Sequence, residues 1–393
     1  MRIAFFSDFS LAQVTGISDV IRTLMQGLKE RGHAVCLFAP SEPAGTPDLE
    51  TLEHVALPSI GVPGAPTFRF PLPFGVPQAL RDFRPDVLHT HTFGSIGFRA
   101  VWSAKRLHAP LVGTEHTLPA EYAHYFHLDY VWARNALKRF AARYYQKCDA
   151  VTAPSHAVAE ELRSDGVTKP IRVIENPLET GIFRPLPDSA GLKKQWGITK
   201  TAVLSFGRLA KEKNIGELLE AFALLRKNGT DAELVIIGSG PAERDLRAQV
   251  ATLKIGDATR FLGTRRGEEL SQAVNATDVF AITSRSENQS MTTLQAMACG
   301  LPVIGVNCGG LPEYIRDGEN GFIVESGDTH ALATRLAGLL SDAAQRKTLG
   351  ERGRQMAAEH APERIVERME ELYSSIVKND VPKSGFARLE GHK

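Results

Sequence analysis

Short apolar runs rich in β-branched residues alternate with longer amphipathic segments along the chain, and this alternation constrains the fold most. It is typical of a parallel sheet whose strands are joined by crossover helices. The expected helices include Ile17–Arg31 and Ile215–Lys227, each with one apolar stripe. The pattern predicts strands at 2–8, 34–40, 86–92, 110–117, 149–155 and 172–177 in the first half, and at 202–208, 232–238, 259–264, 278–284, 302–307 and 321–325 in the second.

Six strands followed by six strands indicate an α/β protein with two Rossmann-like domains in tandem, which suits a chain of 393 residues. Two prolines and a loss of pattern at 183–188 predict the linker. We therefore expect one domain over 1–184 and a second over 185–361. The helix predicted over 362–378 either closes the second domain or crosses back to complete the first. Residues 379–393 have weak periodicity and are expected to fray.

Composition excludes several classes of protein. Lys and Arg number 46 against 45 Asp and Glu, so no excess of positive charge favours a nucleic-acid partner. The four cysteines are scattered, which excludes a disulfide scaffold and a zinc ribbon and fits a reducing compartment. The amino terminus reads as a first strand and not as a signal peptide, and no run of 18 apolar residues occurs. We expect a cytoplasmic protein that can still contact the inner face of the membrane.

Polar residues follow the strands of the second half, where ligands bind in open α/β sheets. Arg208 and Lys213 follow strand 202–208 and form a reasonable anion clamp, although a solvated loop would also carry such charges. Glu287 follows strand 278–284 and can accept hydrogen bonds from a polyol or simply support the next helix start. Free backbone N–H groups of residues 290–293 at that helix start would favour a phosphate.

A glycine pair, Gly309 and Gly310, follows strand 302–307. It indicates either a close approach of the backbone to a ligand or merely a tight turn. No complete G-x-G-x-x-G follows any strand, so the fingerprint of a dinucleotide-dependent hydride-transfer enzyme is missing.

Histidines concentrate in the first half, with nine of the twelve before residue 180. His89 and His91 point to the same face of their strand, and His116 follows the next strand. No H-E-x-x-H or other compact ligand set is present, so we expect no metal site. His116 is the candidate for a role in chemistry, and one of the other two is expected to be structural support.

Together these motifs resemble the retaining GT-B glycosyltransferases of the large family that includes bacterial diacylglycerol glucosyltransferases and phosphatidylinositol mannosyltransferases. The resemblance covers nearly the whole chain. Its most specific parts are Gly207-Arg208-Leu209 with Lys213, the block from Glu287 to Val303, and Gly309-Gly310-Leu311-Pro312-Glu313; looser parts are Gly16, His89-Thr90-His91 and His116-Thr117.

The resemblance implies two domains facing a cleft, no cofactor, and a nucleotide-sugar donor held mainly by the second domain. Arg208 and Lys213 would neutralise the donor diphosphate, and Gly16 would let the first loop approach it. Glu287 would bind the hydroxyls of the donor sugar, and His116 would lie beside the reacting sugar. The remaining donor-binding positions implied are Asn288, Gln289, Ser290, Met291, Thr292 and Gln295.

Two positions depart from the family pattern. Gln295 stands where a second glutamate normally binds the ribose hydroxyls, and an amide loses the charge-assisted hydrogen bond. We therefore expect weaker or altered binding of the nucleotide, but not a loss of enzymatic activity. Asn176-Pro177 replaces a more usual Asn-Gly, which changes the expected backbone turn.

The chemistry of glycosyl transfer fits these residues. Positive charge develops on the sugar and negative charge on the departing diphosphate, which cations and helix N-termini stabilise without a bound metal. No carboxylate nucleophile for a double displacement emerges from the sequence, so we expect front-face transfer with retention. Rival hypotheses are a nucleotide-sugar 2-epimerase and a non-catalytic sugar-nucleotide sensor.

The acceptor is expected to be a membrane lipid such as diacylglycerol, with UDP-glucose as the default donor. Residues 113–125 look most like the diacylglycerol glucosyltransferase branch. Segment 132–147 predicts a basic, aromatic-bearing helix that can lie on anionic lipid, or a solvated helix with an ordinary buried stripe. The apolar, proline-rich segment 59–80 is expected to be a loop, either packed on its own domain or offered to a lipid-like acceptor.

Overall fold

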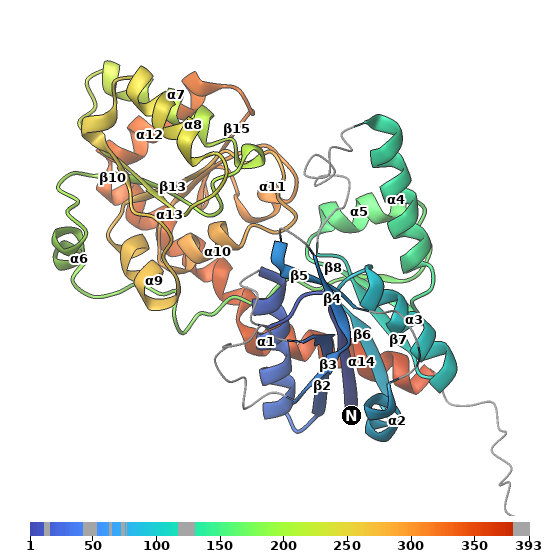
Figure 1. The fold of residues 1–393 in the computed structure, drawn as a ribbon. Helices are drawn as coiled ribbons and strands as arrows, with labels where there is room; N and C mark the ends of the chain where they lie inside the picture. Colours follow the sequence, from blue (N-terminus) through green and yellow to red (C-terminus); the bar gives the residue numbers. More distant parts are fainter. Residues whose placement is uncertain are drawn as a thin grey trace, which may run out of the picture.

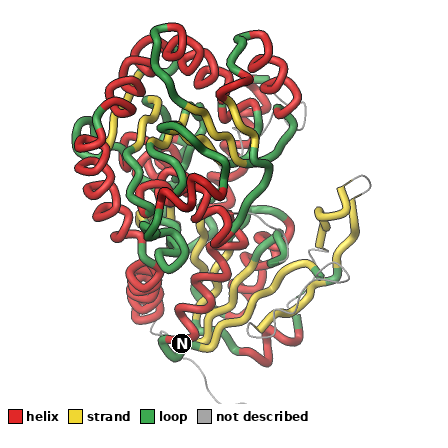
Figure 2. The backbone as a smooth tube through the Cα atoms, turned by 90° about the vertical axis from the view of Figure 1, so that its left-hand side faces the viewer, coloured by secondary structure: helices red, strands yellow, loops and turns green. Residues whose placement is uncertain are grey.

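The computed structural model describes residues 1–11, 16–41, 53–62, 65–71, 75, 77–116 and 130–379, with 60–62, 65–71 and 379 described by their backbone alone. Two parallel sheets are flanked by helices (Figure 1), and a separate pair of strands projects from one side of the molecule in Figure 2. The predicted α/β class with two Rossmann-like domains is confirmed.

The first sheet has the strand order β3-β2-β1-β6-β7-β8-β9, and every pair is parallel. Five of the strands match predicted positions, the predicted sixth at 172–177 is shorter, and β3 was missed. The strands are β1 (Arg2–Phe6), β2 (Ala34–Pro40), β3 (Glu53–Leu57), β6 (Val87–Thr90), β7 (Leu111–Thr114), β8 (Ala150–Ala153) and β9 (Ile171–Val173); the helices are α1 (Gly16–Glu30), α2 (Gln78–Phe83), α3 (Ser95–Leu107), α4 (Val131–Tyr145) and α5 (His156–Ser164).

The second sheet has the order β12-β11-β10-β13-β14-β15 and is also parallel. All six predicted strands are present, and the predicted helix 215–227 has the observed bounds. The strands are β10 (Ala202–Phe206), β11 (Glu233–Ile237), β12 (Thr259–Phe261), β13 (Val279–Ile282), β14 (Val303–Val306) and β15 (Gly321–Val324); the helices are α6 (Ser189–Gln195), α7 (Ile215–Lys227), α8 (Glu243–Thr252), α9 (Gly267–Asn275), α10 (Met291–Ala298), α11 (Leu311–Tyr314), α12 (Thr329–Ser341), α13 (Ala343–Ala357) and α14 (Pro362–Asn379).

The loop predicted over 59–80 is wrong, because this segment forms an antiparallel hairpin and the start of α2. The hairpin pairs β4 (Ser59–Val62) with β5 (Ala65–Pro71). Proline is excluded from central strands, but both strands of an isolated hairpin are edges and tolerate it. The apolar side chains on which the acceptor-surface hypothesis depended lie outside the described side chains.

Helix α14 packs against the first sheet, although it follows the second domain in the sequence (Figure 1). Strand β1 alternates between two cores: Ala4 and Phe6 face α3, α4 and α5, whereas Ile3 and Phe5 face α1 and α14. Methyl and aromatic groups of α14, from Ile365 to Tyr373, fill this second core. The first sheet ends at Val173 and the second begins at Ala202, and the boundary between residues 184 and 185 remains our proposal.

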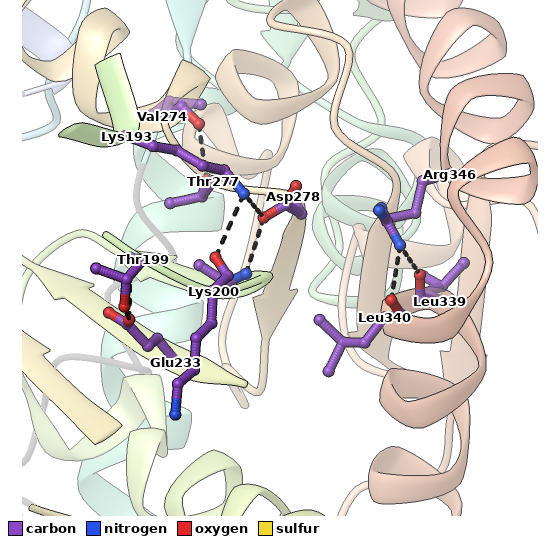
Figure 3. A network of polar contacts seen from close by, with 11 residues as sticks. Lys193, Thr199, Lys200, Glu233, Val274, Thr277, Asp278, Leu339, Leu340 and Arg346 are labelled. Carbon is purple, nitrogen blue, oxygen red and sulfur yellow. Dashed lines mark hydrogen bonds and ion pairs between the residues drawn. The ribbon is translucent and has the colours of Figure 1, made fainter. Parts of the chain in front are cut away.

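A polar network fixes the amino-terminal edge of the second sheet (Figure 3). Asp278 accepts from Lys193 Nζ at 2.6 Å and from the Ala202 amide at 2.8 Å, which ties α6 to β10 and β13. Glu233 accepts from Thr199; burial acts to raise the pKa of this carboxyl, but hydrogen bonds from Thr199 and Arg260 outweigh it and lower the pKa. These charges are structural, and ligands are expected at the opposite edge.

Candidate active site

Lys213 and Glu287 meet although 74 residues separate them in the sequence. Lys213 lies in a single 3₁₀ turn after β10, and the end of β13 holds this turn in place. The Thr283 hydroxyl donates to the Asn214 carbonyl at 3.0 Å, and the Arg285 amide donates to the Glu212 carbonyl at 2.9 Å. Lys213 Nζ then lies 2.6 Å from Glu287 Oε1, and the Glu287 side chain is only 8% exposed.

A cavity of about 280 Å³ opens at this point, at the carboxyl ends of β10 and β13. Arg208, Lys213 and Glu287 all line it, as the sequence predicts for an anion clamp beside a polyol-binding carboxylate. The ammonium group of Lys213 has three N–H donors, and the bond to Glu287 uses one of them. The cavity therefore combines two cations with two carboxylates, of which Glu287 holds the ion pair with Lys213. Its lining is Ser205, Phe206, Gly207, Arg208, Glu212, Lys213, Ile215, Ile282, Thr283, Ser284, Glu287 and Thr292.

The glycine pair Gly309 and Gly310 is required by the loop that carries Glu287. A Cβ on Gly309 would lie 2.4 Å from the Glu287 carbonyl oxygen, and a Cβ on Gly310 would lie 2.4 Å from that of Asn288. The Gly310 amide donates to the Glu287 carbonyl at 2.8 Å. The two glycines thus let the backbone pack closely against the loop that carries Glu287. A close approach of this backbone to a ligand, one of the two sequence-based alternatives, stays a proposal.

The next two residues of this loop reach out of the second domain. Asn288 Nδ2 donates to the His116 carbonyl at 3.0 Å, and Gln289 Oε1 accepts from the Asn176 amide at 2.6 Å. Both side chains are therefore engaged with residues of the first domain. The donor-binding role expected of Asn288 and Gln289 stays a proposal for their backbone groups.

Helix α10 begins with its own cap. Ser290 Oγ accepts from the Thr293 amide at 3.3 Å, so the expectation that residues 290–293 all offer free N–H groups is wrong for Thr293. Thr292 lines the cavity, and Gln295 lies one turn further along the same face of α10. Met291 and Gln295 are half-buried, as a donor-facing helix start allows.

Three histidines cluster at the carboxyl ends of β6 and β7. The rings of His89 and His91 lie 4.1 Å apart, which confirms that they share a face, and His91 Nδ1 lies 3.0 Å from His116 Nε2. Burial lowers the pKa of His116 to about 4; burial, with the nearby His116, lowers that of His89 to about 3. Burial and both neighbours also lower the pKa of His91. All three rings are neutral at pH 7.

Gly16 is the first residue of α1, and a Cβ there would meet no atom within 4 Å. The predicted approach of this position to a ligand stays a proposal, because residues 12–15 lie outside the described part of the chain. The acceptor-like segment 117–125 also lies outside it. Within the described residues, no three His, Cys, Asp or Glu side chains are arranged to hold a metal ion.

Contacts between the domains were missed by the sequence analysis. Glu313 accepts from the His156 and Ala157 amides at 2.8 and 2.7 Å, so this residue of the second domain caps α5 of the first. The Tyr314 hydroxyl donates to the Pro154 carbonyl at 3.0 Å. The glycine-rich motif gave a signal for a ligand site, but no local pattern indicates which distant helix a glutamate will cap.

Each half of the chain matches a known family of glycosyltransferases. Residues 14–181 match the family described as Glycosyltransferase Family 4, and residues 190–356 match Glycosyl transferases group 1. The alpha-monoglucosyldiacylglycerol synthase of Streptococcus pneumoniae is 32% identical over 317 residues, which cover 77% of this chain and 70% of that protein. A GDP-mannose-dependent alpha-mannosyltransferase of Mycobacterium tuberculosis is 29% identical, covering 89% of this chain and 92% of that protein.

Solved structures share the fold. HepE of Anabaena in complex with UDP superposes with a TM-score of 0.79 at 21% identity, covering 95% of this chain and all of that chain. The lipopolysaccharide outer core galactosyltransferase WaaB superposes with a TM-score of 0.70 at 17% identity, covering 96% of this chain and all of that chain. These similarities confirm the GT-B arrangement of two Rossmann-like domains.

Proposed function

The chain belongs to the family 4 glycosyltransferases with the GT-B fold, and on that premise we propose that it transfers a hexose, with retention, from a nucleotide sugar to a lipid hydroxyl. The observation that carries this proposal is the cavity at the ends of β10 and β13, where Arg208 and Lys213 stand beside the shielded carboxylate of Glu287. Two cations suit a diphosphate, and the carboxylate suits sugar hydroxyls.

In the proposed reaction the bond between the anomeric carbon and the diphosphate oxygen breaks, and its electron pair stays on the phosphate. Arg208 and Lys213 stabilise that charge as it develops. The acceptor oxygen bonds to the same face of the sugar, and its proton passes to the departing phosphate. Neutral His116 contributes hydrogen bonds beside the sugar and not a charge. Because the two cations stabilise the charge on the departing diphosphate, we propose that sugar transfer continues in the presence of a chelator.

The names of two relatives support two alternative donors, and the name of the first also supports the proposed acceptor. The Streptococcus pneumoniae protein is named a synthase of alpha-monoglucosyldiacylglycerol, which supports glucose as the sugar and diacylglycerol as the acceptor. The Mycobacterium tuberculosis protein is named GDP-mannose-dependent, which supports a second donor. UDP-glucose remains our default because the first of these relatives is the more similar in sequence.

The test is a panel of UDP- and GDP-sugars, each incubated with and without vesicles that contain diacylglycerol, in buffer with EDTA. We expect nucleotide release from one donor that depends on the vesicles, and an α-linked glycolipid as product. A β-linked product would overturn retention. A new sugar nucleotide formed without acceptor would indicate the epimerase instead, and donor binding without turnover would indicate the sensor.

Helix α4 carries the surface that we propose meets the membrane. Tyr130, Val131 and Trp132 at its start are 61%, 77% and 69% exposed, and Phe140 is 45% exposed. Arg139 and Arg143 are exposed on the helix, and its sequence contains no acid. No helix in the described part of the chain is both long and apolar enough to cross a membrane. An exposed aromatic start with a basic stripe suits peripheral contact with anionic lipid.

Charge reversal on α4 should therefore weaken membrane binding. We expect R139E/R143E to lower binding to vesicles of phosphatidylcholine with phosphatidylglycerol by tenfold or more, since each cation near an anionic surface contributes about 1 kcal/mol. Co-sedimentation measures it. The matched control, K347E/R352E on exposed α13, should bind like the wild type. Equal binding by all three proteins would remove α4 from the proposal.

A further inference from the structure

The carboxy-terminal helix contributes a hydroxyl to the histidine cluster. Tyr373 of α14 is fully buried, and its Oη lies 2.5 Å from His89 Nδ1. The two residues are 284 positions apart in the sequence. Among the described residues, His89 Nδ1 is the hydrogen-bond partner of this hydroxyl. The phenol keeps its proton, because burial holds the pKa of Tyr373 well above its usual value.

The single proton of the phenol determines the tautomer of His89. If the hydroxyl only accepted from His89 Nδ1, its own O–H would be a buried donor without an acceptor, which is costly. The hydroxyl therefore donates to Nδ1, and the neutral ring carries its proton on Nε2. That N–H points to Thr114 Oγ1 at 2.6 Å, and the Thr114 hydroxyl continues to Thr152 Oγ1 at 2.5 Å.

This chain of hydrogen bonds passes through the strand that leads to His116. Thr114 is the last residue of β7, two residues before His116. His89 also packs against His91, whose Nδ1 contacts the His116 ring. Two ion pairs join α14 to the first domain. Glu370 lies 2.6 Å from Arg31, and Arg368 lies 2.6 Å from Glu175.

We propose that Tyr373 is a positioning residue for His116: it fixes His89 as the Nε2–H tautomer, and His89 then holds the end of β7 through Thr114. The inference rests on the proposed function, in which His116 lies beside the reacting sugar. A helix that follows the second domain thus completes the reaction centre of the first. Tyr373 acts through other residues and does not itself meet the donor.

The first test removes the hydroxyl with Y373F and measures transfer and tautomer separately. We expect kcat to fall about tenfold with the donor KM within twofold, which is about 1.4 kcal/mol in the transition state alone. Ring-nitrogen NMR should show the Nε2–H form of His89 in the wild type, assigned with H89Q, and a different tautomer population in Y373F. Tyr144→Phe is the matched control, because this buried hydroxyl donates to Thr90 at 3.0 Å and not to a histidine.

A second variant breaks the next link without touching α14. Thr114→Val should lower kcat to a similar degree, and Y373F/T114V should fall no further than either single variant. Additive losses, an unchanged kcat in Y373F, or an equal loss in Y144F would overturn the inference. If the wild type transfers no sugar, the proposed function fails, whereas an unchanged His89 tautomer in Y373F would refute the role of Tyr373 by itself.

Discussion

Replacing Lys213 with methionine is expected to lower kcat/KM for the nucleotide sugar by about 10²- to 10³-fold, the loss typical of removing one donor to a developing anion. The methylene stem keeps its packing, and the ammonium group beside Glu287 is lost. Because the charge on the diphosphate grows toward the transition state, most of the loss should appear in kcat. Steady-state kinetics with varied donor measures both constants.

The matched control for this variant is K211M. Lys211 is exposed and lies in the same 3₁₀ turn, two residues before Lys213. General loss of positive charge near the cavity would affect both variants alike, so K211M should stay within threefold of the wild type. A K213M enzyme with near-normal kcat/KM would contradict the assignment of Lys213 to the leaving group.

A double variant separates the two roles that remain open for Glu287. Removing Lys213 alone leaves a largely buried carboxylate without its ion-pair partner, which costs stability. K213M/E287Q should therefore recover much of the lost thermal stability. If Glu287 only supports Lys213, the double variant should be no less active than K213M. If Glu287 binds the sugar, activity should fall further, and the proposed mechanism expects this second result.

The part of the site that contains Arg208 and Glu287 could be predicted from the sequence because of its position relative to the strands. Arg208 and Glu287 each follow a strand of the same parallel sheet, and β10 pairs directly with β13. The rule that ligands bind at the carboxyl ends of strands therefore brings the two residues together before any coordinates are known. The fold was predictable for the same reason, since buried parallel strands give continuous apolar runs that a sequence displays plainly.

The remaining features depend on packing between distant segments. β3 is an edge strand, EHVAL, with one buried residue, so it lacks the apolar run by which the other strands were found. The apolar pattern of α14 does not by itself indicate the domain on which the helix packs, and its docking against α1 places Tyr373 beside His89. Asn288 likewise gives no local sign that it will bind the His116 carbonyl across the domain boundary.

Acidification is expected to destabilise the folded protein steeply below pH 6.5, before most carboxylates titrate. The folded-state pKa values of His89 and His116, about 3 and about 4, lie below the ordinary value of 6.5. His91 is shifted in the same direction. As the pH falls below 6.5, these histidines become protonated in the unfolded chain, whereas in the folded chain they stay neutral. The stabilisation is therefore complete above pH 6.5 and is lost progressively toward pH 4.

The expected slope follows from three groups of the same sign. Each contributes up to about 1.4 kcal/mol per pH unit, so the free energy of unfolding should fall by up to about 4 kcal/mol per pH unit near pH 5. Urea unfolding at pH 7, 6 and 5 measures it. His116→Asn should remove about one third of the slope. If the free energy of unfolding does not change between pH 7 and 5, the three histidines bind protons in the folded protein. The proposed mechanism, in which His116 is neutral, would then be wrong on this point.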